Sequence, residues 1–241
     1  LSHRVLPPRG EHVAACLVLI AIPCGLIIRQ PDLGTSLLIG ASGLFGIFMA
    51  GIGWCFIGGA ALAAVLSAWP AWMFVLQDYQ KQRILTLLNP ESDKLGAGWN
   101  IIQSKTAIGS GGFSGKGWTQ GTQSQLDFLP ESHTDFIIAV LAEEFGLRGV
   151  LLLLLLYFLI LLRAFWLGTR AQSSYGRILC GSLTLTFFVY VFVNMGMVAG
   201  LLPVVGVPLP LVSAGGTSVV TLMAAFGLLM AVGTEKRVVG Q

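Results

Sequence analysis

The sequence predicts an all-α polytopic membrane protein with about six transmembrane helices and one long extracytoplasmic loop. Of its 241 residues, 55% are hydrophobic and 10% are charged, whereas soluble domains have roughly 25% charged residues. Its apolar runs approach the roughly 20 residues that cross about 30 Å of hydrocarbon. These runs are continuous rather than alternating, which argues against a membrane β-barrel. The net charge of +3, without a basic run, gives no reason to expect nucleic-acid binding.

Six apolar blocks account for the predicted spans, and short polar or glycine-rich connections separate several of them. The blocks cover residues 13–28, 33–51, 54–76, 136–162, 178–201 and 208–233. Arg29 and Asp32 lie in the first connection, and Pro203 and Pro210 bound the last. Because the number of spans is even, both ends of the chain should lie on one side of the membrane.

Charge asymmetry predicts the orientation, because Lys and Arg in short connections favour the cytoplasmic side. The side of the termini carries Arg4, Arg9, Arg163, Arg170, Arg177, Lys236 and Arg237. The opposite side carries most of the carboxylates: Asp32, Asp78, Glu91, Asp93, Asp127, Glu131 and Asp135. We therefore expect cytoplasmic termini and an extracytoplasmic loop at residues 77–134.

The fourth block, residues 136–162, is longer than a bilayer requires. As one helix it would measure about 40 Å, at about 1.5 Å per residue. Its first half contains Glu143, Glu144 and Arg148, and its second half is almost entirely Leu. The first half should therefore face protein or a water-filled cavity, since charges that face lipid are costly. Asp135, just before the block, is suited to cap this helix.

The polar loop ends in a cluster of ionisable residues, Glu131, His133 and Asp135, at the junction with the fourth block. A carboxylate there can act as a general base toward a hydroxyl, and a nearby His can tune it or bind a phosphate. The alternative is that Asp135 only caps the helix and that His133 is an ordinary exposed loop residue. The spacing alone leaves both interpretations open.

Glu143, Glu144 and Arg148 also have two interpretations. Glu144 and Arg148 are four residues apart and would share a helix face. They could form an ion pair that neutralises charge inside the protein. Alternatively, together with Glu143 about 12 Å below Asp135, they could line a polar pocket for a substrate head group.

Two glycine-rich segments complete the set of candidate motifs. In residues 108–118, backbone N–H groups could approach a phosphate, with Lys105 and Lys116 supplying charge. The alternative for this segment is a merely flexible connection, because it matches neither a P-loop nor a dinucleotide fingerprint. Residues 208–218 predict either a broken helix that lines a cavity or tight packing through small residues. The four cysteines, Cys16, Cys24, Cys55 and Cys180, lack ligand spacing and are expected to be small buried apolar residues.

Taken together, these motifs resemble the SEDS family (shape, elongation, division and sporulation) over essentially the whole chain. The matching stretches are Gln30-Pro31-Asp32-Leu33-Gly34-Thr35-Ser36, Tyr79-Gln80-Lys81-Gln82-Arg83, Asn89-Pro90-Glu91-Ser92-Asp93, Gly117-Trp118, Gly121-Thr122-Gln123-Ser124-Gln125-Leu126, Phe128-Leu129-Pro130-Glu131-Ser132-His133-Thr134-Asp135-Phe136, Ala142-Glu143-Glu144 and Pro208 to Ser218. Several motifs in the same order are far more specific than any one of them. The sequence departs from the family pattern at Ala214, where a Tyr is usual, and at Asn89, where an Asp is common.

The resemblance implies a fold of about ten membrane helices, of which the last six match residues 1–241 as a single, N-terminally truncated transmembrane domain. Members of the family are bacterial peptidoglycan glycosyltransferases that polymerise lipid II outside the cytoplasmic membrane. They work with a class B penicillin-binding protein, the transpeptidase. The closest similarity is to the branch that elongates the lateral wall and maintains rod shape.

The resemblance also assigns roles to residues. Asp135 falls on the essential loop aspartate of the family and is expected to be the catalytic base. From their charge and position, and not from the resemblance, Lys105, Lys116 and Arg83 are expected to stabilise the departing pyrophosphate. Further substrate-binding candidates are Glu131, His133, Glu143 and Glu144. A divalent cation, Mg²⁺ or Mn²⁺, could be held by carboxylates, although no ligand set is assigned, and no organic cofactor is expected.

Two other functions remain open at the level of the sequence. Charged residues inside a span and a broken last helix would suit a transporter, or flippase, of the lipid-linked precursor. The crowding of polar residues on the outer side favours an enzyme, because a transporter needs sites that are reached from both sides. A non-catalytic scaffold for the transpeptidase is the second alternative.

Overall fold

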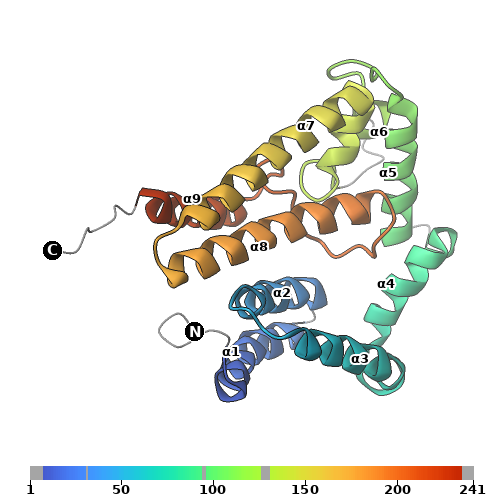
Figure 1. The fold of residues 1–241 in the computed structure, drawn as a ribbon. Helices are drawn as coiled ribbons and strands as arrows, with labels where there is room; N and C mark the ends of the chain where they lie inside the picture. The colour runs from blue at the N-terminus through green and yellow to red at the C-terminus, as the bar shows by residue number, and fades with distance from the viewer. Residues whose placement is uncertain (1–7, 31, 94–95, 126–130, 235–241) are drawn as a thin grey trace. The chain divides into compact units, whose positions relative to one another are not determined.

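The computed structural model describes residues 8–30, 32–93, 96–125 and 131–234, and this part of the chain is almost entirely helical, with no β-strand (Figure 1). The helices are α1 (Gly10–Ile28), α2 (Leu33–Met49), α3 (Trp54–Pro70), α4 (Asp78–Leu88), α5 (Ala97–Gly111), α6 (Thr122–Gln125), α7 (Ile137–Arg170), α8 (Ser174–Val198) and α9 (Gly216–Thr234). A π-helical turn, Ala71–Val75, follows α3, and a 3₁₀ turn, Pro90–Ser92, follows α4. Outside the described residues lie parts of the predicted motifs and charge pattern: Arg4, Pro31, Leu126, Asp127, residues 128–130, Lys236 and Arg237.

The predicted class of all-α membrane protein is confirmed. In the described residues, α1, α7, α8 and α9 are long and apolar enough to cross a membrane, and α2 and α3 are shorter apolar helices. These six helices coincide with the six predicted blocks. Two details differ. The last helix begins at Gly216 rather than at residue 208, and the polar loop contains helices α4, α5 and α6.

The chain forms two compact units, which are described separately. One contains residues 1–81, 163–186 and 225–241. Its helices α1 and α2 approach closely, because Gly43 leaves room for the side chain of Ile20. Asp32 begins α2 by accepting a hydrogen bond from the Thr35 N–H at 3.0 Å. A small core of Ala164, Cys180 and Leu229 joins the second and third segments of this unit.

The cysteines of the described chain are all free thiols. Cys180 is buried, as expected, and Cys16 and Cys24 are half-buried. Cys55 is exposed on α3, so the expectation of a buried residue is wrong for this position. An apolar face of a membrane helix can carry a small thiol toward lipid, because the surrounding hydrocarbon is itself apolar.

The second unit contains residues 82–162 and 187–224 and holds every candidate site residue. In this unit α7 and α8 lie alongside each other, with the rings of Tyr157 and Phe187 edge to face at a centroid distance of 5.8 Å (Figure 1). The first part of α7 is buried in protein through Ile138, Ala139, Ala142 and Glu143. The Leu-rich part exposes most of its large side chains. This burial agrees with the expectation that the charged first half faces protein or a water-filled cavity.

Helix α7 is not the single straight rod that the sequence predicted. Gly146 adopts φ 66° and ψ −162°, which places a kink nine residues into the helix. Glycine fits this left-handed conformation because it has no Cβ. The kink separates Glu144 from Arg148, and the two form no ion pair. Instead, the Arg148 guanidinium lies over the Phe113 ring at 4.8 Å.

The glycine-rich segment after α5 docks on this kink. Its Lys116 and Gly117 N–H groups donate to the carbonyls of Glu143 and Glu144 at 2.9 and 3.0 Å. In return, the Leu147 and Arg148 N–H groups donate to the carbonyls of residues 112 and 113 at 2.9 and 3.3 Å. The kink therefore has its backbone groups paired. The Lys116 and Gly117 N–H groups are therefore taken up by α7 and are not free to bind a phosphate.

Candidate active site

Residues 131–136 form a turn that leads into α7. The N–H groups of Thr134 and Phe136 both donate to the Glu131 carbonyl, at 3.3 and 3.2 Å. Phe136 has an exposed fraction of 0% and anchors the end of the turn in the core. The side chains of Glu131 and His133 are exposed, and that of Asp135 is half-buried. The turn thus carries all three ionisable residues that the sequence singled out.

Three successive backbone carbonyls of this turn accept hydrogen bonds from residues outside it. The His133 carbonyl accepts from the Ala214 N–H at 3.0 Å, and the Thr134 carbonyl accepts from the Ser213 hydroxyl. The Asp135 carbonyl accepts from the Asn194 side-chain amide at 2.9 Å. Position 214, where the sequence departs from the family pattern, contributes through its backbone and needs no ring for this bond.

The segment between α8 and α9, residues 199–215, supplies two of these three contacts and is itself fixed. The Tyr157 hydroxyl of α7 donates to the Pro210 carbonyl at 2.6 Å. The Ser213 hydroxyl accepts from the Leu209 N–H at 2.7 Å. This segment is the broken entry to the last helix that the sequence suggested, and it packs beneath the turn. Sequence reasoning missed Asn194 and Tyr157, although Asn194 is the one carboxamide in the otherwise apolar α8.

Asp135 has the electrostatic character of a base that works near neutral pH. Burial, as the largest cause, together with the charge of Glu131 and a hydrogen bond between the two side chains, raises the pKa of its carboxyl from 3.8 to about 6. An acid of this pKa is largely ionised at pH 7 and can still take up a proton. One carboxylate oxygen lies beside Gly206, at 3.5 Å from the place where a Cβ would stand.

The simpler interpretation of Asp135 as a helix cap is not supported. Helix α7 begins at Ile137, and the fully buried Phe136 stands directly before it. In the described part of the chain, no backbone N–H of α7 donates to the Asp135 carboxylate. The carboxyl group instead shares a hydrogen bond with the Glu131 side chain.

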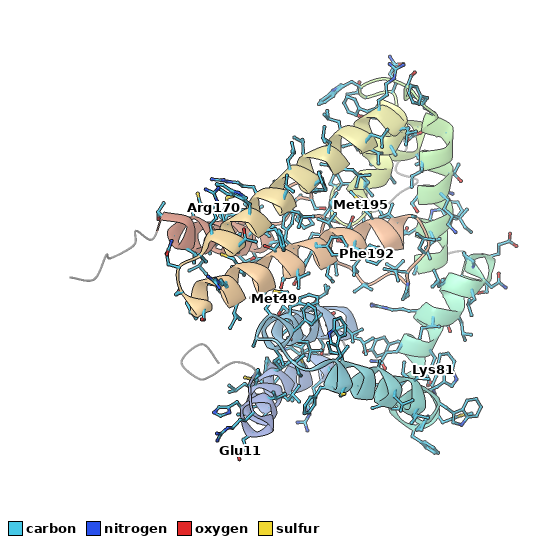
Figure 2. All side chains as sticks on the ribbon, viewed as in Figure 1. Glu11, Met49, Lys81, Arg170, Phe192 and Met195 are labelled. Atoms are coloured by element: carbon cyan, nitrogen blue, oxygen red, sulfur yellow. The ribbon has the colours of Figure 1, made fainter. Side chains whose placement is uncertain are left out.

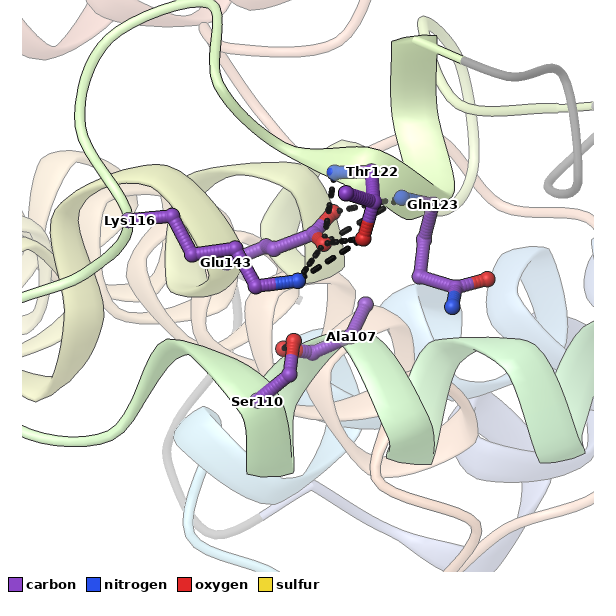
Figure 3. A network of polar contacts seen from close by, with 6 residues as sticks. All are labelled: Ala107, Ser110, Lys116, Thr122, Gln123 and Glu143. Carbon is purple, nitrogen blue, oxygen red and sulfur yellow. Dashed lines mark hydrogen bonds and ion pairs between the residues drawn. The ribbon is translucent and has the colours of Figure 1, made fainter.

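Glu143 lies at the centre of a separate polar network beneath α6 (Figure 3). Its carboxylate accepts from the Lys116 ammonium at 2.6 Å, from the Thr122 N–H at 2.9 Å and hydroxyl at 3.1 Å, and from the Gln123 N–H at 3.2 Å. Glu143 has an exposed fraction of 0%. The network joins α6 and the glycine-rich segment to α7.

The remaining candidates lie elsewhere in the unit. The Lys105 side chain extends over Gly200, just beyond the end of α8. Arg83 lies on α4, and Glu144 is half-buried beside the kink. Within the described ranges no group of three or more His, Cys, Asp or Glu could hold a metal ion.

These features define a polytopic α-helical membrane protein whose candidate site is a carboxylate held at the entry of a kinked membrane helix. The FTSW_RODA_SPOVE family, described as cell cycle protein, matches residues 2–238, and the chain belongs to this family. The resemblance to the SEDS family is thereby confirmed.

Several known proteins are similar to the chain. It is 54% identical over all 241 residues to peptidoglycan glycosyltransferase MrdB of Escherichia coli (strain K12), and it spans 65% of that protein's length. It is 39% identical over 214 residues to the probable peptidoglycan glycosyltransferase FtsW of Trichlorobacter lovleyi, which covers 89% of this chain and 55% of FtsW.

Solved structures share the fold. A chain from a study of the structural coordination of polymerization and crosslinking by a peptidoglycan synthase complex has a TM-score of 0.78 and 30% identity, with 98% of this chain and 65% of that chain covered. The rod shape determining protein RodA of Thermus thermophilus has a TM-score of 0.61 and 26% identity, with 95% of this chain and 58% of that chain covered.

Proposed function

We propose that the full-length protein, meaning this chain with any segments that accompany it naturally, is a peptidoglycan glycosyltransferase of the bacterial cytoplasmic membrane. It would polymerise lipid II into glycan strands for lateral-wall elongation and rod shape. The single observation that carries this proposal is the Asp135 carboxylate, with a pKa of about 6 on a turn held at three carbonyls. The relatives named peptidoglycan glycosyltransferase support the reaction class.

In the proposed reaction, an acceptor sugar hydroxyl attacks the anomeric carbon of a lipid-linked donor. The new glycosidic C–O bond forms as the bond from that carbon to the pyrophosphate oxygen breaks. Asp135 takes the hydroxyl proton, and the polyprenyl pyrophosphate leaves. A half-buried carboxylate suits this step, because the surrounding protein excludes water while the pKa stays near the working pH.

The departing pyrophosphate needs positive charge. Lys105 and Arg83 are the proposed contributors, together with Lys116. In the ion pair the Lys116 ammonium uses one N–H toward Glu143 and one toward Thr122, and an ammonium has a third N–H to offer. Glu131, His133 and Glu144 are proposed to contact the sugars or the phosphates, and Glu143 to act through Lys116. If a divalent cation takes part, it would neutralise charge on the pyrophosphate, and no ligand set is assigned to it.

The proposed orientation places residues 77–134 and Asp135 outside the cytoplasm and the termini inside. Arg163, Arg170 and Arg177 support it, because they lie in the last part of α7 and the first turn of α8, whereas Asp135 precedes the first residue of α7. Figure 2 labels Arg170 at this end of α7. The proposed partner is a class B penicillin-binding protein. Similarity to a chain of a peptidoglycan synthase complex supports that proposal.

The test is polymerisation of purified lipid II by the full-length protein in detergent, with the products separated on a gel. Glycan strands are expected if the protein is a polymerase. A transporter would form none, because a detergent solution has no separate compartments between which a substrate could be moved. Absence of strands when the transpeptidase partner is also present would contradict the proposed activity. Strand formation by an Asp135→Asn variant at the normal rate would contradict the proposed base.

A further inference from the structure

Asn194 occupies an unusual position for a polar side chain. It lies in the apolar helix α8 with an exposed fraction of 0%. Its side-chain amide donates both of its hydrogen bonds to acceptors outside the helix. One is the Asp135 carbonyl at 2.9 Å, and the other is the Val207 carbonyl at 2.6 Å. One side chain thus bridges the turn before α7 and the segment before α9.

Packing alone does not account for this residue. In the described part of the chain, the side-chain oxygen of Asn194 is buried without a hydrogen-bond partner. A buried polar atom without a partner is costly, so an apolar side chain of similar size would avoid that penalty. What an apolar residue cannot supply is the pair of donors, and those donors end on the backbone of Asp135 and next to Gly206.

The two carbonyls bonded by Asn194 lie in the two backbone segments beside the Asp135 carboxylate. Asp135 carries the carboxylate, and Gly206, which faces it, directly precedes the tethered Val207. Gly206 has φ +79°, a conformation that side chains rarely adopt. The backbone beside the carboxylate therefore carries no side chain at Gly206, and the Asn194 amide joins this backbone to that of Asp135.

We propose that Asn194 is the positioning residue of this site: its side-chain amide fixes the Asp135 backbone against residues 206–207, so that the carboxylate faces the acceptor position at a set distance. This inference rests on the proposed function. We call the hydrogen bonds that Asn194 and Ser213 donate to the turn the clamp. Ser213 belongs to it because its hydroxyl donates to the Thr134 carbonyl, one residue before Asp135. Residues 199–215 contain no ionisable side chain, and Glu131 is the charged neighbour that acts on Asp135.

The experiment compares Asn194→Asp with wild type in the full-length protein, measuring kcat, KM, the pH dependence of kcat/KM and the melting temperature. The substitution keeps the shape and replaces both donors by an acceptor. We expect kcat to fall by about 100-fold, the loss that a misplacement of about 1 Å can cause, with little change in KM. The acid limb of the kcat/KM profile should move below pH 6 toward 3.8, the ordinary pKa of an aspartate. A turn that is no longer held exposes the carboxylate to water, which lowers its pKa.

Ser104→Ala is the matched control. Ser104 is also fully buried, and its hydroxyl donates to the Val198 carbonyl of another helix at 2.9 Å, but it does not touch the turn. This control should keep the wild-type kcat and acid limb. An Asn194→Asp protein that keeps both, or a Ser104→Ala protein that loses as much, would overturn the proposal.

Ser213→Ala keeps the test decisive if Asn194→Asp does not fold. It removes the neighbouring clamp bond and should shift kcat and the acid limb in the same directions, and equality with Ser104→Ala would overturn the proposal. Asp135→Asn, measured in parallel, separates the two hypotheses. If Asp135→Asn is inactive while the clamp variants are normal, only the positioning role fails; if Asp135→Asn is active, the proposed base fails.

Discussion

The ammonium of Lys116 lies 2.6 Å from the carboxylate of Glu143, although the two residues are 27 positions apart in the chain. The pair fastens the glycine-rich segment after α5 to the buried first part of α7. The two partners differ in burial: the Glu143 side chain is fully buried, and that of Lys116 is 27% exposed. This difference has a measurable consequence for stability.

Lys116→Met should destabilise the protein more than Glu143→Gln. Removal of Lys116 leaves a buried carboxylate without its cation, which costs about 3–5 kcal/mol in comparable buried pairs. In Glu143→Gln the amide oxygen still accepts from Thr122 and Gln123, and Lys116 can turn to water. Thermal unfolding in detergent measures both variants. If both variants lost the same number of degrees in melting temperature, the difference in burial between Glu143 and Lys116 would have no effect on stability, contrary to this prediction.

Gly146→Ala should destabilise the kink in α7. A Cβ there would lie 2.7 Å from the Phe113 carbonyl and closer still to the Gly115 nitrogen, at a φ of +66°. The left-handed backbone alone costs about 1–2 kcal/mol for a residue with a Cβ. Gly109→Ala in α5 is the control, because a Cβ there meets nothing within 4 Å, and an Ala in a helix is favoured over Gly by about 1 kcal/mol. The account fails if the two substitutions change the melting temperature alike.

Tyr157→Phe should loosen residues 199–215. It removes the hydroxyl that donates to the Pro210 carbonyl and leaves that carbonyl unpaired in a buried place, at a cost of about 1–3 kcal/mol. The ring and its contact with Phe187 remain. Tyr175→Phe, at a position 59% exposed, is the matched control and should be nearly neutral. Similar melting temperatures for both variants would rule out a role for the Tyr157 bond.

The pH dependence of the reaction should follow Asp135. Because the base must be ionised, kcat/KM should rise with pH through about 6. The effect on stability has the opposite sign. Since the folded pKa is raised above 3.8, the contribution of Asp135 to stability is complete below that value and is lost as pH rises through about 6.

Glu131→Gln should move the acid limb of kcat/KM to lower pH, because it removes the neighbouring negative charge that helps to raise the Asp135 pKa. Glu91→Gln, which removes an exposed carboxylate from the 3₁₀ turn after α4, should leave the limb in place. A limb that stays at the wild-type pH in Glu131→Gln would mean that Glu131 does not act on Asp135.

The sequence was sufficient for the membrane class and the six apolar helices, because long continuous apolar runs specify such helices directly. It was not sufficient for the kink, since the spacing of Glu144 and Arg148 is that of an uninterrupted helix and only the fold shows Gly146 in a left-handed conformation. The last helix was placed too early because Leu and Val continue through residues 207–212 without forming a helix there.

The site was predicted in part. Asp135 emerged through the resemblance to the family, while spacing alone left a helix cap open. Lys116 and Glu143 were each singled out, but their pairing depends on the docking of the glycine-rich segment. Asn194 could not be predicted because its partner, Asp135, is 59 residues away and is contacted through its backbone carbonyl, which has no signature in the sequence.

The central claim is that Asp135 takes the proton from the acceptor hydroxyl. The most direct test is the rate of lipid II polymerisation by full-length Asp135→Asn, compared with wild type at equal folded protein as judged by melting temperature. Loss of a positioned general base predicts a fall in kcat of about 10²–10⁴-fold with the fold intact. A variant that polymerises at the wild-type rate would contradict the claim.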